Sequence, residues 1–215
     1  MERTERATDS LPARLFLLAC DVEAERVKWG DELGYAVRAG VLAELTARGC
    51  LREEGRKARP VGDRRTGDPV LDGVLREIAG LPRPKSWSAL VRRERRRTCL
   101  ALEGQLAKSG AISVESRTLR RKRVTVHERD LPARLRAEAA ATLTGSEPAG
   151  RIEPLRAALA SMAALSRLCP ELNWRVRYAN RRRLKELTER AGPAGRGLKK
   201  ALDTRRAAHN GGGGG

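Results

Sequence analysis

The chain has 215 residues, with 45 Lys or Arg against 27 Asp or Glu, which gives a formal net charge of +18 at pH 7. Its length is sufficient for a substantial hydrophobic core, and its charge predicts attraction to polyanions such as nucleic acid, anionic lipid or acidic protein. The longest uncharged run, Ala157 to Ser166, is too short to span a bilayer, so any membrane contact is expected at the surface. Arginine-rich composition also accompanies a GC-rich genome, which would explain part of the charge without any partner.

The titratable residues give little support for an enzyme. The four cysteines are far apart, with no Cys-x-x-Cys pair, and neither of the two histidines flanks a cysteine. This spacing indicates buried, reduced thiols rather than a zinc site or a disulfide framework. No nucleophile is spaced to pair with a general base, so we expect no catalytic residues, no cofactor and no metal.

Helix patterns dominate the sequence. Ser10 and Pro12 open the first helix, Asp31 and Gly49 bound the second, and Asp68 with Pro69 begins the third. One long helix is expected from Ser86 or Ser88 to Lys108. Further helices are predicted over residues 131–143, 152–168 and 178–190.

One stretch has the alternation of a strand pair instead. Apolar residues alternate with polar ones over 111–128, which predicts a β-hairpin, and residues 51–65 are expected to form a short strand and a polar loop. We therefore predict one mainly α domain over residues 10–190. Residues 1–9 and 191–215 are expected to be flexible basic or glycine-rich tails.

Two basic clusters, 92–97 and 120–123, are the candidate functional features. Each can be read as a solvated face, or as a polyanion contact that relieves the repulsion between like charges. A helix that leads into a hairpin with a basic tip is also typical of a winged-helix nucleic-acid-binding protein. Gln105 and Asn173, the residues able to read bases, are poorly placed for that role.

Four stretches, taken in order, carry a family resemblance: LPARLFLLAC, WGDELGYAVRAGVLAELTARG, TGDPVLDGVL and LEGQLAKSGAI. Over Leu11 to about Leu187 the chain resembles the Golgi phosphoprotein 3 family, in a bacterial version. The resemblance implies a single helical domain around a central helical bundle, with a projecting β-hairpin. Eukaryotic members bind phosphatidylinositol 4-phosphate on Golgi membranes and recruit the cytosolic tails of glycosyltransferases.

The resemblance also implies a headgroup site. Trp29 matches the family's tryptophan and Arg38 the arginine of the following helix, and we expect Arg38 to be at least partly exposed. Arg96 falls on one basic position of the later helix, whereas Cys99 falls on the other. Arg92 or Arg93, one turn earlier, would compensate for that cysteine. Trp29 has a second interpretation, in which its indole seals the core where the helix begins.

The hairpin departs from the eukaryotic pattern. Its expected tip consists of Leu119 followed by Arg120, Arg121, Lys122 and Arg123. These residues favour electrostatic adsorption to an anionic membrane, at about 1 kcal/mol per basic side chain, over apolar insertion.

The sequence therefore predicts a non-enzymatic, cytoplasmic, peripherally membrane-associated adaptor. Its expected partners are an anionic lipid with a phosphoinositide-like headgroup, cytosolic tails of membrane proteins, and a second copy bound through the hairpin. The alternative is a nucleic-acid-binding protein that uses the basic helix and the hairpin.

Overall fold

The computed structural model describes residues 7–28, 30–117 and 121–211. The longer helices are α2 (Leu11–Leu18), α3 (Asp31–Ala47), α4 (Pro69–Ala79), α6 (Arg95–Ser109), α7 (Leu131–Thr144), α8 (Pro154–Leu165), α10 (Arg181–Arg190) and α11 (Gly192–Gly211). The short ones are α5 (Trp87–Arg92), α9 (Trp174–Ala179) and the 3-10 turns η1 (Ala149–Arg151) and η2 (Pro170–Leu172). The prediction of a single, mainly helical domain is confirmed.

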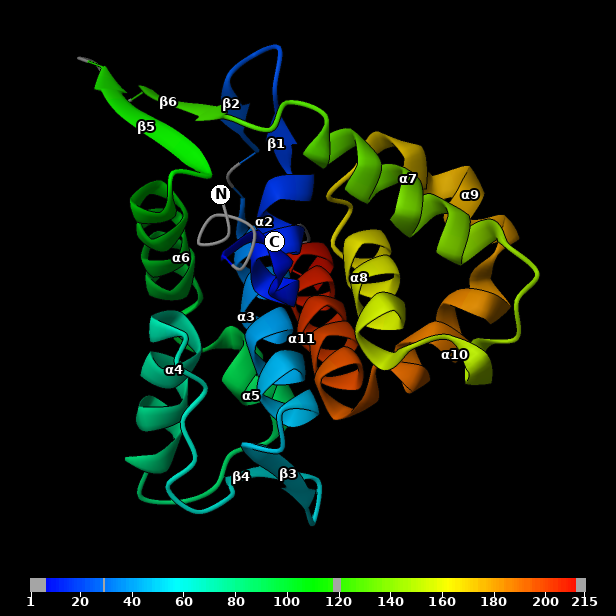
Figure 1. Ribbon diagram of the computed structural model, residues 1–215. Coiled ribbons are helices and arrows are strands. Elements are labelled where there is room, and N and C mark those ends of the chain that lie inside the picture. Colours follow the sequence, from blue (N-terminus) through cyan, green and yellow to red (C-terminus); the bar gives the residue numbers. More distant parts are fainter. Residues whose placement is uncertain (1–6, 29, 118–120, 212–215) are drawn as a thin grey trace.

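Helix α3 forms the middle of the domain. Every residue from Leu33 to Leu45 is buried, because α2, α5, α6, α8 and α11 all pack against it. Figure 1 shows α3 beside α11, with α4 and α6 on one side and α7, α8, α9 and α10 on the other. A helix that is surrounded in this way is part of the core rather than an amphipathic surface helix.

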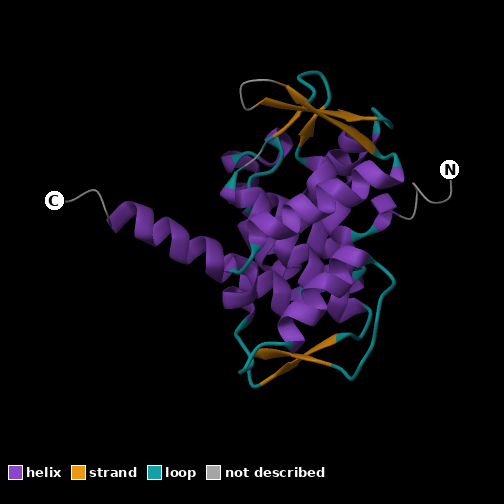
Figure 2. Cartoon of the chain, turned by 90° about the vertical axis from the view of Figure 1, so that its left-hand side faces the viewer, coloured by secondary structure: helices purple, strands orange, loops and turns teal. Residues whose placement is uncertain are grey.

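Helix α11 contradicts the prediction of a flexible tail after residue 190. It packs against α3, α5 and α8, and it buries Ala194, Leu198, Ala201 and Leu202. Gly197 permits the contact with α5, because a Cβ at this position would lie 2.8 Å from Trp87 Cβ. The last part of α11, including Ala207 to His209, is exposed and projects from the body of the domain (Figure 2).

The predicted long helix from residue 86 to 108 is two helices. It breaks at Arg93 and Glu94, where Glu94 adopts a left-handed conformation with φ 46°. Helix α10 likewise begins later than expected, because the shorter α9 precedes it and ends at Ala179.

Three antiparallel hairpins complete the described fold: β1–β2 (Cys20–Asp21, Arg26–Val27), β3–β4 (Leu51–Glu54, Lys57–Pro60) and β5–β6 (Ile112–Arg117, Arg121–Val126). The β5–β6 pair confirms the predicted hairpin, with Val114 opposite Val124. Hairpin β3–β4 lies at one end of the domain, and the other two lie together at the opposite end (Figures 1 and 2).

The segment TGDPVLD has a structural role. Asp68 caps α4 by accepting hydrogen bonds from the backbone N–H groups of Val70 and Leu71, as predicted. Asp72 accepts hydrogen bonds from the N–H and hydroxyl of Thr66, at 2.7 and 2.8 Å, and these bonds close the loop before α4.

Candidate functional site

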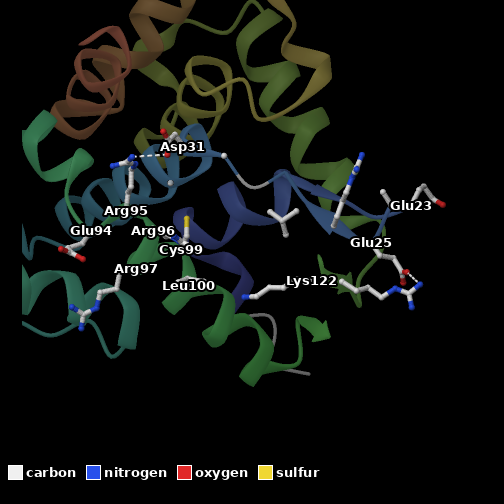
Figure 3. Close-up of a pocket in the computed structure, with 16 residues that line it drawn as sticks. Glu23, Glu25, Asp31, Glu94, Arg95, Arg96, Arg97, Cys99, Leu100 and Lys122 are labelled. Atoms are coloured by element: carbon white, nitrogen blue, oxygen red, sulfur yellow. Dashed lines mark hydrogen bonds and ion pairs between the residues drawn. The ribbon is translucent and has the colours of Figure 1, made fainter. Parts of the chain in front are cut away.

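A cleft of about 1350 Å³ opens beside the two adjacent hairpins (Figure 3). Its walls come from four parts of the chain: the β1–β2 turn, the start of α3, the first turns of α6, and β6. The lining residues are Glu23, Ala24, Glu25, Arg26, Val27, Gly30, Asp31, Gly34, Glu94, Arg95, Arg96, Arg97, Cys99, Leu100, Lys122 and Arg123.

Ion pairs hold these walls together. Glu25, in the β1–β2 turn, pairs with Arg123 on β6, and its backbone carbonyl accepts a hydrogen bond from Val124 N–H at 2.8 Å. Lys122 Nζ lies 2.7 Å from Oε1 of the buried Glu103 on α6. The hairpin β5–β6 is therefore joined both to α6 and to the β1–β2 turn.

The start of α3 is joined to α6 and α11 in the same way. Arg95 lies 3.2 Å from Asp31 and stacks over the ring of Tyr35, with 4.8 Å to the centroid. Gly34 gives this side chain room, because a Cβ there would meet Arg95 Cγ at 3.2 Å. Arg205 of α11 also bonds to Asp31, at 3.3 Å, so the segment expected to be a tail supports the cleft.

Two arginines in the cleft remain free to bind an anion. Arg96 and Arg97 are exposed, and their guanidinium groups make no ion pair or hydrogen bond with any described residue. Figure 3 shows Arg95 turned toward Asp31 and Arg97 pointing in a different direction. Glu94, on the same rim, is likewise without a described side-chain partner. It adds a negative charge that would disfavour anions placed close to it.

Two lining residues of the cleft, Cys99 and Leu100, carry no charge. Cys99 is fully buried, and burial raises the pKa of its thiol to about 12, with Glu103 adding to the effect. Leu100 is 43% exposed at the edge. Cys99 is therefore a neutral thiol at the position where the resemblance implies a second basic residue, so it supplies no charge to a phosphate.

Arg38 is not in the cleft, so the expectation that it is partly exposed is wrong. It is 0% exposed, and its guanidinium donates to Leu90 O at 3.1 Å, to Thr98 Oγ1 at 3.0 Å and to both carboxylate oxygens of Glu77 at 2.9 and 3.0 Å. Burial lowers its pKa, and the adjacent Glu77 opposes that effect. Arg38 thus connects the end of α5 to the first turns of α6 and keeps the break between them in place.

The break in the helix also changes the expected roles of two neighbouring arginines. Arg92 and Arg93 end α5 and do not line the cleft. Arg93 Nε lies 2.8 Å from Glu77, the carboxylate that also holds Arg38, so Arg93 belongs to this structural network. The expectation that either residue compensates for Cys99 is not met by this geometry.

Some predicted site residues lie outside the described part of the chain. They are Trp29, Leu119 and Arg120; for Arg121 the backbone alone is described. In the sequence, Trp29 falls between Val27 and Gly30, and those two residues both line the cleft. Lys122 and Arg123, predicted as part of a membrane-contacting tip, are engaged with Glu103 and Glu25 in the walls of the cleft.

Sequence reasoning missed the β1–β2 turn, Arg95 and Arg97 as parts of this site. Strands of two residues have no measurable alternation, so the pattern gave no signal for β1 and β2. Arg95 and Arg97 were within the basic cluster but could not be separated from Arg92 and Arg93 without knowing where the helix breaks.

Together, the fold and the cleft define a class: a mainly helical domain with an arginine-lined cleft next to two hairpins. No helix in the described ranges is long and apolar enough to cross a bilayer. Residues 11–205 match the model of the Golgi phosphoprotein 3 (GPP34) family, and the chain belongs to this family. Membership implies an adaptor-like role in a family of non-enzymatic, phosphatidylinositol 4-phosphate-binding Golgi proteins. No curated protein matches the chain.

Proposed function

We propose that this protein is a cytoplasmic peripheral-membrane adaptor that binds the phosphorylated headgroup of an anionic phospholipid in the cleft at the start of α6. The observation that carries the proposal is the pair of exposed arginines without described partners, Arg96 and Arg97, in a cleft whose other basic residues are mostly ion-paired. Guanidinium groups bind phosphate oxygens through paired N–H donors, and a free guanidinium gives up no existing partner when it does so.

The cleft also has a surface suited to the rest of a lipid. Leu100 is exposed at its edge beside the arginines. A headgroup phosphate at Arg96 and Arg97 would leave the glycerol part of the lipid near this apolar side chain. Trp29 remains a proposed contact because of its place between two lining residues.

Compared with the family pattern, this site has lost two cations. Cys99 is neutral and Arg38 is engaged inside the domain. We therefore propose weaker dependence on one particular headgroup than in eukaryotic members, with a bacterial anionic phospholipid or glycolipid phosphate as the physiological ligand. Cytosolic tails of membrane proteins and self-association through the β5–β6 hairpin remain proposals from family membership.

The nucleic-acid alternative receives no specific support from the described contacts. Gln105, the candidate base-reading residue on α6, donates from Nε2 to Asp68 Oδ2 at 2.8 Å and so helps join α6 to α4. We keep nucleic-acid binding as an outcome of the test below.

The test compares binding to phosphatidylcholine vesicles that contain either phosphatidylinositol 4-phosphate or enough phosphatidylserine to give the same surface charge. We expect the wild-type protein to favour the phosphoinositide. Arg96→Ala with Arg97→Ala should weaken that binding about tenfold or more, because two charge-assisted contacts are lost.

The matched control is Arg52→Ala with Arg59→Ala. It removes the same charge from exposed positions on β3–β4, at the opposite end of the domain, and should change binding by about twofold at most. Equal wild-type binding to both vesicle types would refute the headgroup site. Tight duplex DNA binding that is lost in the Arg96/Arg97 variant would identify the cleft as a nucleic-acid site.

A further inference from the structure

A second surface, on α9, is not explained by the cleft. Trp174 is 65% exposed and Tyr178 is 67% exposed, although the whole chain contains only 6 aromatic residues. They are four positions apart on a helix, so their rings lie on the same face, one turn from each other. Among the described residues, they and Leu100 are the large hydrophobic side chains that are exposed.

Arginines surround these two rings. Arg175 lies over Trp174 with 5.4 Å to the ring centroid, and Arg181 lies over Tyr178 with 5.1 Å. Residues 167–183 contain six arginines and one glutamate. Burial lowers the pKa of Arg177, and the nearby positive charges of Arg167 and Arg206 lower it further. Positive charge is therefore concentrated around an exposed apolar pair.

The helix that presents the two rings has hydrogen bonds at both of its ends. Asn173 Oδ1 caps it by accepting from the N–H groups of Arg175 and Val176, at 3.0 and 3.2 Å. Arg177 donates to Leu172 O at 2.6 Å, and Asn180 closes the other end by donating to Val176 O at 2.9 Å. The rings are thus displayed on a hydrogen-bonded helical turn and not on a loose chain.

Two rings that are each about two-thirds exposed do not enclose a small ligand, which needs a concave site. A stacking site for single-stranded nucleic acid uses open ring faces along a groove that follows the backbone, whereas here one face of each ring is already covered by an arginine. Trp, Tyr and Arg side chains together suit the boundary of a lipid bilayer, where the rings enter the headgroup level and the guanidinium groups stay with the phosphates.

We propose that α9 is a second membrane contact, which lies on an anionic bilayer with Trp174 and Tyr178 at the headgroup–acyl boundary. Charge complementarity selects an anionic surface as the occupant. The proposal rests on the protein acting at membranes, but it does not require a headgroup in the cleft. It predicts that part of the membrane affinity is independent of headgroup identity.

The experiment measures partitioning onto phosphatidylcholine–phosphatidylserine vesicles without phosphoinositide. Trp174→Ala with Tyr178→Ala should weaken partitioning about tenfold, because two interfacial rings are removed. The matched control, Trp174→Phe with Tyr178→Phe, keeps both rings and should stay within about threefold of wild type. Because both side chains are exposed, all variants should melt at the wild-type temperature.

Fluorescence gives an independent measurement on the same protein. Brominated lipids should quench Trp174 in vesicle-bound wild type, and the quenching should fall in the Trp174→Phe variant. Unchanged partitioning of the Ala variant would overturn the proposal. If the Ala variant loses binding to single-stranded oligonucleotide or to polyglutamate but still binds vesicles, the proposal is likewise overturned. That result would identify another polyanion as the partner.

The two proposals fail separately. If vesicles with phosphoinositide and with matched phosphatidylserine bind equally, but Trp174 is quenched and the Ala variant partitions weakly, the headgroup site is wrong and the α9 contact stands. If the Arg96/Arg97 variant loses headgroup selectivity while the α9 Ala variant binds as wild type, the α9 contact is wrong and the headgroup site stands.

Discussion

Replacing Arg38 by methionine is expected to destabilise the whole domain, because this arginine is inside it. Methionine fills much of the same volume but has no donors. The variant would leave Thr98 Oγ1 without its guanidinium donor and would break the ion pair to Glu77, whose side chain is 23% exposed. Leu90 O keeps a second, backbone donor, Arg93 N at 3.2 Å.

The size of the loss follows from these contacts. A hydrogen bond to a charged group contributes about 1.5–3 kcal/mol, and breaking a fully buried ion pair costs about 3–5 kcal/mol. Glu77 is partly exposed and keeps its ion pair with Arg93, so the cost of breaking the Arg38–Glu77 pair is at the low end of that range. We expect a decrease of about 3 kcal/mol in the free energy of unfolding. Arg38→Lys, which keeps the charge but not the planar fork of donors, should lose about half as much.

Urea unfolding followed by circular dichroism measures this difference. The control is Arg182→Met, which removes an arginine that is 94% exposed and paired with Glu186, and which should cost about 0.5 kcal/mol or less. Without urea, and at a temperature at which Arg38→Met is folded, the vesicle binding of this variant should remain within a few-fold of wild type. A variant that is as stable as wild type but binds no lipid would refute this reasoning, because Arg38 would then be a ligand contact.

Two further predictions concern the packing of α11 and the loop before α4. Gly197→Ala should destabilise the domain by about 1–3 kcal/mol, because its Cβ would meet the Trp87 backbone at 3.0 Å. The control Gly73→Ala, which has open space around it, should stabilise the domain by up to about 1 kcal/mol. Thermal melts measure both changes, and changes of the same sign for the two variants would contradict this account. Asp72→Asn should cost about 1 kcal/mol near neutral pH. Burial raises the Asp72 pKa, but the hydrogen bonds from Thr66 and Gly67 outweigh burial, and the net effect lowers the pKa. The carboxylate's contribution to stability is therefore present above the unfolded-state pKa of about 3.9, and it is lost as pH falls through the lower folded-state pKa. The difference between the wild type and the Asn variant in urea midpoints should therefore shrink below about pH 4, and a difference that does not depend on pH would contradict it.

Local patterns in the sequence were sufficient for most of the elements. Pro69 after Asp68, the apolar spacing of α3 and the alternation of Val124 and Val126 each depend on neighbours within one turn or one strand, and each gave the observed element. The family motifs likewise gave the fold class, because they are continuous stretches of chain. Bacterial origin stays a prediction.

The tertiary structure decided where the charges lie. In sequence, Arg38 and Arg96 are both basic residues on helices. In the folded chain, Arg38 is surrounded by Leu90, Thr98 and Glu77, which are distant in sequence, while Arg96 is left free. Helix periodicity gives the face of a side chain but not what packs against that face, and α3 is covered all round.

The same reason explains the error at the C-terminal end. GPAGRG has the composition of a linker, since glycine disfavours an isolated helix. In the folded domain, Gly197 allows α11 to lie directly against α5, and burial of Leu198 and Leu202 outweighs the cost of the glycines. The sequence alone determined which segments can be helices and strands; packing between segments far apart in the chain determined which helix became the core and which arginines remained free to bind an anion.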